Sequence, residues 1–159
     1  MLRTLFVATL LLGLVACASK EDTADTQLPE KQLLDEAQER LESESYTTAI
    51  EYLQLLEARY PFGVYAEQAQ VSLIYAYYKS GEREAAIEAA DRFIRLHPQH
   101  PNIDYAYYLR GLANFDQTKG PLDAIAPSDP AERDASNIEA AFGDFATLLA
   151  YYPESEYAA

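Results

Sequence analysis

The sequence contains almost no cysteine: one residue among 159, at position 17. A lone cysteine cannot form a disulfide within the chain, so its presence at this position needs another reason. Without disulfides, the fold has to be stabilised by packed apolar surface. The roughly 130 residues that follow the first 29 are enough for one hydrophobic core.

Basic residues are scarce as well, because 12 lysines and arginines stand against 26 acids and the formal net charge is −14. Binding to nucleic acid depends on cations that meet phosphates, so we expect no nucleic-acid partner. The same balance argues against a polybasic grip on anionic lipid. Most of the acids are best explained as solubilising surface charge.

No apolar run is long enough to cross a membrane, which takes about 20 residues. Leu5 to Val15 is shorter, follows the positive Arg3 and ends in small residues, which predicts a secretory signal over residues 1–16. The run Leu14-Val15-Ala16-Cys17 resembles the bacterial lipobox, in which the processed cysteine becomes the mature N-terminus. The alternative is a simple signal peptide that happens to contain cysteine.

From the lipobox we predict lipidation at Cys17 and a lipid anchor. A thioether-linked diacylglycerol and an N-acyl chain together supply more than one buried chain, which is what stable anchoring takes. Ala18 follows the cysteine where an aspartate would favour retention at the inner membrane; by resemblance to sorted lipoproteins, this predicts the outer membrane. Residues 17–29 are polar and acidic without apolar periodicity, which predicts a flexible tether.

The sequence also lacks a glycine-rich phosphate loop and a nucleophile elbow. The many carboxylates fall on predicted solvent faces of helices, with no pair singled out. His97 and His100 lie in a turn rich in proline, but a His-x-x-His pair without a nearby acid or cysteine is a weak metal signal. We therefore expect no enzyme, no metal site and no bound cofactor.

The clearest positive signal in the sequence is the recurrence of apolar residues at helical spacing. Two amphipathic runs between Tyr65 and Pro98 flank the turn at residues 79–82. Their apolar residues recur at helical spacing, as Ala69, Leu73, Ala76 and Tyr77 and then as Ala86, Ala90, Phe93 and Ile94. Gly81 is placed to end the first helix in a left-handed conformation. Pro98 ends the second, because the residue before a proline is pushed out of the helical region.

The second half of this unit occurs three times in the same register. The corresponding sets are Ala49, Leu53, Leu56, Tyr60 and Pro61; Ala86, Ala90, Phe93, His97 and Pro98; and Ala141, Phe145, Leu148, Tyr152 and Pro153. A helix–turn–helix unit of about 34 residues that closes on a proline is typical of tetratricopeptide repeats. We predict an all-α helical-repeat solenoid with about three helix pairs. A generic helix bundle, the alternative, does not need this register three times.

The predicted repeat domain covers residues 30–159, with repeats at about 30–63, 64–101 and 102–156. The third repeat is longer than the second, since its closing proline comes 55 residues later (153 − 98) instead of 37 (98 − 61). We assign the excess to a long loop at 116–136, which is either functional or a plain surface excursion. Tyr157 follows Pro153 as Tyr65 follows Pro61, where a new helix is expected, so the chain is interpreted as the N-terminal part of a longer repeat array.

Tyrosine is abundant, with 13 residues and no tryptophan. In this class of repeat the first helix of each pair faces a concave groove, and mapping that face predicts an aromatic and apolar wall. Its predicted members are Leu34, Gln38, Leu41, Val71, Tyr75, Tyr78, Tyr105, Tyr108, Leu112 and Phe115. Tyrosine combines a large contact area with a hydrogen-bonding tip, which suits peptide binding. The alternative is that several of these rings fill the core. A carboxylate clamp is not predicted, because only Lys79 and Arg110 lie near.

Several strings carry a resemblance to a known family. They are the lipobox, the runs at residues 59–63 (RYPFG), 73–79 (LIYAYYK), 92–96 (RFIRL), 100–106 (HPNIDYA) and 110–112 (RGL), and the pattern over residues 141–157. Together they resemble the BamD (ComL-type) family of outer-membrane protein assembly lipoproteins. The resemblance implies a five-repeat periplasmic lipoprotein of the β-barrel assembly machine.

The implied partners are the other subunits of that machine, the C-terminal signals of unfolded outer-membrane proteins, and the outer membrane through the lipid anchor. The implied location is the periplasmic face of that membrane. Only three repeats are present here, so contacts that the family assigns to its last repeats cannot be located. The alternative function is a structural envelope or peptidoglycan-associated scaffold that handles no clients.

Overall fold

A computed structural model describes residues 28–117 and 135–158 of the chain. Its elements are α2 (Glu30–Glu42), α3 (Tyr46–Arg59), α4 (Ala66–Ser80), α5 (Arg83–Leu96), α6 (Ile103–Gln117), α7 (Ala135–Tyr151) and the short 3-10 helix η2 (Glu156–Ala158). The predicted signal segment, the lipidation site Cys17 and nearly all of the predicted tether lie outside the described residues.

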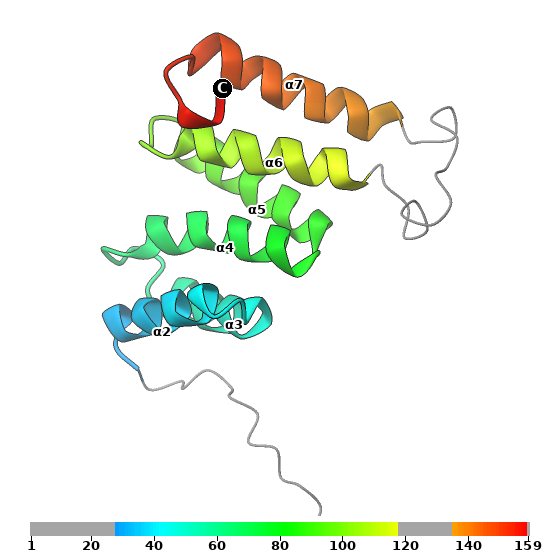
Figure 1. Ribbon diagram of the computed structural model, residues 1–159. Helices are drawn as coiled ribbons and strands as arrows, with labels where there is room; N and C mark the ends of the chain where they lie inside the picture. The colour runs from blue at the N-terminus through cyan, green and yellow to red at the C-terminus, as the bar shows by residue number, and fades with distance from the viewer. Residues whose placement is uncertain (1–27, 118–134, 159) are drawn as a thin grey trace, which may run out of the picture.

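The helices form three consecutive pairs, α2–α3, α4–α5 and α6–α7, stacked in one direction (Figure 1). Each helix packs on the next one along the chain, and α4 also packs directly against α6. The described ranges contain no strand, and none of their helices has the length and apolar character needed to span a bilayer. The all-α prediction with three helix pairs is therefore confirmed.

Residues that correspond in the three sequence repeats also occupy corresponding positions in the structure. Ala49, Ala86 and Ala141 are all buried, with at most 3% of their surface exposed. Seven residues further on, Leu56, Phe93 and Leu148 of α3, α5 and α7 are buried to the same extent. The second helix of each pair therefore presents the same face to the core.

The turn that closes each pair is also the same. The N–H groups of Tyr60, His97 and Tyr152 donate to the carbonyls four residues earlier, at 2.8, 2.8 and 2.9 Å. Three residues later the chain makes a further turn, with bonds such as Gly63 N–H to the Tyr60 carbonyl at 3.0 Å. The proline after each of these residues cannot donate to a continuing helix, which is why the helices stop here.

Two connected clusters form the core. The first joins α2 and α3 to the face of α4 that carries Ala69, Leu73 and Ala76. The second joins the other side of α4, through Val71 and Ile74, to α5 and α6. The half-buried ring of Tyr77 packs against both clusters. Helix α4 is thus buried on two sides, as the middle helix of a stacked array has to be.

Glycine is required at two positions. Gly81 ends α4 with φ of +86°, the left-handed conformation predicted from its place in the turn. Gly111 lies in α6 where a Cβ atom would come within 2.7 Å of Phe145 Cε1 on α7. The close approach of α6 and α7 therefore depends on the absence of a side chain at residue 111.

Some predicted boundaries are wrong. Helix α7 spans Ala135–Tyr151, so it begins inside the predicted loop. The predicted loop at 116–136 is too long at both ends, because Asp116 belongs to α6 and Ser136 to α7. Residues 118–134 lie outside the described part of the chain. Helix ends are hard to place because polar residues in a first turn do not reveal the apolar stripe.

Candidate functional site: a face of tyrosines

Six tyrosines from four elements come together on one side of the stack, and we call this set the tyrosine face. Tyr75 and Tyr78 lie on α4, Tyr105 and Tyr108 lie on α6, and all four predicted tyrosines pack against the second core cluster. Tyr46 from the start of α3 and Tyr157 from η2 complete the face. The last two were not predicted from the sequence.

Ring contacts join tyrosines of different elements at each end of the face. The ring of Tyr46 meets that of Tyr75 edge-on, with centroids 6.2 Å apart. Tyr157 lies against both rings of α6, with centroids 4.9 Å from Tyr105 and 5.0 Å from Tyr108. These distances are in the range where aromatic pairs attract beyond their buried area. The C-terminal turn thus covers part of the wall that the sequence predicted as open.

Polar groups border the face. The Tyr78 hydroxyl donates to Asp116 Oδ2 at 3.0 Å, which ties α4 to the end of α6. The Lys79 ammonium lies 5.7 Å from the centre of the Tyr46 ring, a cation–π arrangement. Lys79, near the end of α4, therefore brings a positive charge to one end of the face. Among the described residues, no carboxylate lies within ion-pair distance of the Lys79 ammonium.

Burial changes the acidity of several of these hydroxyls. It raises the pKa of Tyr78 to about 12, with the hydrogen bond to Asp116 as the second cause. Burial also raises the pKa of Tyr105 far above its ordinary value, and the neighbouring hydroxyls of Tyr157, Tyr75 and Tyr108 add to the effect. The pKa values of Tyr46 and Tyr157 are raised, again mainly by burial. At neutral pH these rings are uncharged, so the face is apolar with neutral hydroxyl tips.

The other predicted groove residues divide into core and surface. Leu34 and Val71 are 4% and 8% exposed and belong to the core, so their assignment to the groove is wrong. Leu41 packs against the first core cluster and Leu112 against the second, each half-buried. Gln38 is half-buried too, and Phe115 is 45% exposed. An amphipathic stripe cannot by itself separate a residue that faces a groove from one that faces the next helix.

The histidine pair has an acidic neighbour that the sequence did not reveal. Glu67 of α4 lies with its carboxylate 3.3 Å from His97 Nδ1 and 3.6 Å from His100 Nε2. The remaining ring nitrogens are used, since His97 Nε2 shares a hydrogen bond with Gln70 and His100 Nδ1 accepts from the Asn102 N–H. The described residues hold no group of three or more His, Cys, Asp or Glu side chains suited to a metal ion.

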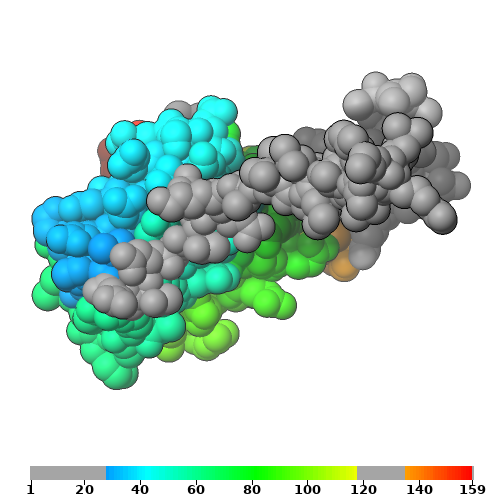
Figure 2. Space-filling view, turned by 90° about the horizontal axis from the view of Figure 1, so that it is seen from below, coloured from blue at the N-terminus to red at the C-terminus, as the bar shows by residue number. Residues whose placement is uncertain are grey.

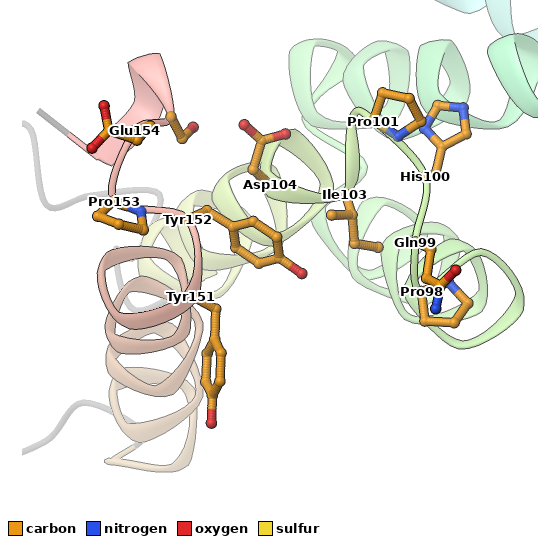
Figure 3. Close-up of a pocket in the computed structure, with 11 residues that line it drawn as sticks. Pro98, Gln99, His100, Pro101, Ile103, Asp104, Tyr151, Tyr152, Pro153 and Glu154 are labelled. Carbon is orange, nitrogen blue, oxygen red and sulfur yellow. The ribbon is translucent and has the colours of Figure 1, made fainter.

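A cleft next to this pair separates the α5–α6 turn from the end of α7. Figure 3 shows Pro98 to Pro101 on one side and Tyr151 to Glu154 on the other, with the start of α6 between them. A similar cleft lies one repeat earlier, between residues 61–70 and His97. Prolines and tyrosines line much of the first cleft, and the second is lined by Phe62 and Val64 beside polar residues. Aromatic side chains at such a surface suit contact with another chain.

An ion-pair network holds the last pair of helices in place. Arg110 of α6 donates through Nε to both carboxylate oxygens of Asp144 on α7, at 3.0 and 3.1 Å, and also pairs with Asp91 of α5. Asp144 is only 5% exposed. Burial alone would lower the pKa of Arg110, but the bonds and charges of Asp144 and Asp91 outweigh it and raise that pKa. Arg110 is thus committed to the scaffold and does not reach the tyrosine face as a clamp.

Stacked helix pairs in one register, each closed by the same turn, define a helical-repeat solenoid with an aromatic face. The profile of the tetratricopeptide repeat family matches residues 19–159, and the chain belongs to this family.

Individual relatives extend the match. The chain is 42% identical over 164 residues to the outer membrane protein assembly factor BamD of Neisseria meningitidis serogroup B, covering 100% of this chain and 61% of that protein. It is 42% identical over 145 residues to BamD of Vibrio cholerae, covering 91% and 60%. For BamD of Haemophilus influenzae the identity is 33% over 156 residues, covering 98% and 58%. The predicted resemblance is confirmed, and the chain spans about three fifths of the length of the curated relatives it matches.

Proposed function

We propose that the protein takes part in the assembly of outer-membrane proteins, as a non-enzymatic periplasmic subunit of the β-barrel assembly machine. Its similarity to outer membrane protein assembly factors over the whole chain supports this proposal. The repeat fold supports it as well, because stacked helix pairs provide an extended binding surface. The partners are the other subunits of the machine and the unfolded proteins that it inserts.

The tyrosine face is the proposed site for those unfolded proteins. The observation that carries this assignment is the gathering of Tyr46, Tyr75, Tyr78 and Tyr108 on adjacent repeats. An extended peptide that ends in an aromatic residue would lay its ring against these rings. Its backbone would bond to the hydroxyls at their tips. Such rings give large contact area at low entropic cost.

Within the face, the part around Tyr75 is the better candidate for a client. Tyr105 and Tyr108 already contact the ring of the chain's own Tyr157, whereas the ring of Tyr75 meets that of Tyr46 edge-on. The nearby Lys79 supplies positive charge at the same end. We expect the client's terminal ring at Tyr75 and its terminal carboxylate on the Lys79 side.

Titration with a labelled peptide tests this site. The peptide carries the last residues of an outer-membrane β-barrel protein, ends in phenylalanine and keeps its free carboxylate. Truncation of a buried aromatic anchor typically costs 2 kcal/mol or more, about 30-fold in affinity. We expect that loss for Tyr75→Ala, with helical circular dichroism unchanged. Tyr151→Ala, which removes a 76% exposed ring outside the face, is the matched control.

The same titration distinguishes the proposed assembly role from the alternative function. A structural envelope scaffold predicts no saturable binding of such a peptide by the parent protein. Equal binding by the parent and Tyr75→Ala, with the parent saturable, would move the site away from this face while leaving the assembly role in place.

Membrane attachment is proposed through lipid at Cys17, which places the protein on the periplasmic face of the outer membrane. The support is the lipobox-like run at residues 14–17 and the net charge of −14, which disfavours an electrostatic hold on anionic lipid. Cys17→Ser should leave the protein unprocessed or release it from membranes. A Cys17→Ser variant with the parent's mature mass and outer-membrane fractionation contradicts the anchor.

A further inference from the structure

The loop between α3 and α4 carries two apolar side chains in full contact with solvent. Phe62 is 99% exposed and Val64 is 84% exposed, the highest values among the large apolar residues of the described chain. Isolated exposed apolar residues are common on protein surfaces. A phenylalanine and a valine so close in the chain, both with most of their surface in solvent, are not explained by the folding of the domain, since neither is buried in the core.

The loop is nevertheless held rigidly. The Tyr65 N–H donates to Glu30 Oε1 at 2.8 Å, and the Gly63 N–H donates to the Tyr60 carbonyl at 3.0 Å. The Glu30 carboxylate lies so close to Gly63 that a Cβ atom there would overlap it. The backbone is therefore fixed while the side chains of Phe62 and Val64 point outward, which lowers the entropic cost of burying them in a partner.

The segment that fixes the loop is the start of the repeat domain. The Arg59 Nη1 donates to the Leu28 carbonyl at 3.0 Å, and Leu28 packs on the first core cluster. Figure 2 looks at this end of the molecule, where the start of α2 (blue) borders the segment after α3 (teal). Phe62 and Val64 thus lie beside the point at which the chain from Cys17 enters the domain.

We propose that Phe62 and Val64 form a membrane contact, which inserts into the lipid surface next to the anchor. The proposal rests on the proposed lipid at Cys17. Leu28 lies eleven positions after Cys17 (28 − 17), a length of chain that can span at most about 40 Å. Because the domain is tied to the membrane at its α2 end, this end is the part of the molecule held closest to lipid.

The negative charge of the protein implies that this contact is hydrophobic and not electrostatic. The chain has 26 acids and 12 bases, so attraction to anionic headgroups cannot drive it. An apolar pair inserted at the headgroup boundary needs no such attraction, because its driving force is burial of apolar surface. The contact should therefore persist in vesicles without anionic lipid.

A tryptophan at residue 62 provides the test, because the natural sequence contains none. Phe62→Trp and Phe142→Trp are made in the full chain. Phe142 is also a highly exposed phenylalanine, 74%, but it lies on α7 at the far end of the stack (Figure 1). Each variant is coupled through the thiol of Cys17, the only cysteine, to a maleimide lipid in phosphatidylcholine vesicles. The chain is made by cell-free synthesis, so that the Cys17 thiol stays free for coupling, and the tether is then imposed whether or not the cell lipidates the protein.

The expected result is a blue-shifted emission for Phe62→Trp that brominated lipid quenches, with little quenching for Phe142→Trp. Replacing Val64 by serine in the Phe62→Trp chain should reduce the quenching while circular dichroism stays unchanged. Equal quenching of the two tryptophans, or none in either, overturns the membrane contact and leaves the loop to a protein partner. The mass of the protein made in cells tests the lipid anchor separately, so the two proposals can fail independently.

Discussion

The ring of Tyr157 stacks on the ring of Tyr108, with centroids 5.0 Å apart and planes inclined by 20°. Tyr157 follows the closing turn of the third pair, and Tyr108 lies on the first helix of that pair. The contact therefore joins the end of the described chain to the tyrosine face and makes Tyr108 both a groove residue and a scaffold residue.

A double-mutant cycle on this pair measures the contact. Tyr108→Ala and Tyr157→Ala are each compared with the parent and with the double variant in urea melts. Stacked aromatic pairs contribute about 0.5–1.5 kcal/mol beyond their buried area, and we expect a coupling energy in that range. Tyr151→Ala paired with Tyr108→Ala serves as the uncoupled control. A coupling energy of zero for Tyr108 and Tyr157 would mean that η2 does not hold its place in solution.

Gly111→Ala should destabilise the protein by about 1–3 kcal/mol, because the new methyl group overlaps the ring of Phe145. Gly143→Ala is the matched control: it lies in the partner helix α7 with no heavy atom within 4 Å of the added Cβ. That change should stabilise the protein by about 0.5–1 kcal/mol through helix propensity. Denaturant melts give both values. Phe145→Leu should relieve the Gly111→Ala defect, and failure to do so would place the strain elsewhere.

Arg110→Ala should strongly lower the free energy of unfolding, because it leaves the buried carboxylate of Asp144 without its cation. Breaking one side of a buried pair typically costs about 3–5 kcal/mol. Arg92→Ala breaks the pair with Glu57, whose side chains are more exposed, and should cost about 0–1 kcal/mol. Urea melts compare the two. The pair of changes Arg110→Met and Asp144→Leu should recover most of the loss, because no charge then remains buried.

Stability should fall in alkali as the buried tyrosines ionise. The folded-state pKa of Tyr78 is about 12, above the ordinary value of 10.0, so the folded protein holds this proton more tightly than the unfolded chain. Its contribution is complete below pH 10 and is lost as the pH rises from 10 towards 12. Tyr78→Phe should flatten the decline of unfolding free energy over that window. A decline as steep as that of the parent would assign the effect to other groups.

The sequence predicted the scaffold well because its signals are local. Ala49, Leu53 and Leu56 recur in later repeats at helical spacing, and each set ends on a proline that cannot continue a helix. Gly81 was assigned its role for reasons of backbone geometry alone, and that role is found in the structure. These features depend on neighbours within one helix or one turn.

The site was predicted only in part, since it depends on contacts between elements. The tyrosines of α4 and α6 were predicted, but Tyr46 and Tyr157 come from a second helix and a closing turn that the groove pattern leaves out. The assignment of Leu34 and Val71 failed because both side chains are buried, Leu34 in the first core cluster and Val71 in the second. Glu67 was missed beside His97, 30 residues away in the chain.

The sequence by itself determined that this chain forms helix pairs, how many residues each repeat takes and where each repeat closes. Those properties follow from side-chain period and from glycine and proline geometry, which act over a few residues. Only the tertiary structure decided which stripe of each helix faces the core, which tyrosines meet, and that Phe62 and Val64 lie beside the entry of the chain. Such relations are fixed by the angles and distances at which helices pack, and these depend on every side chain at the contact together.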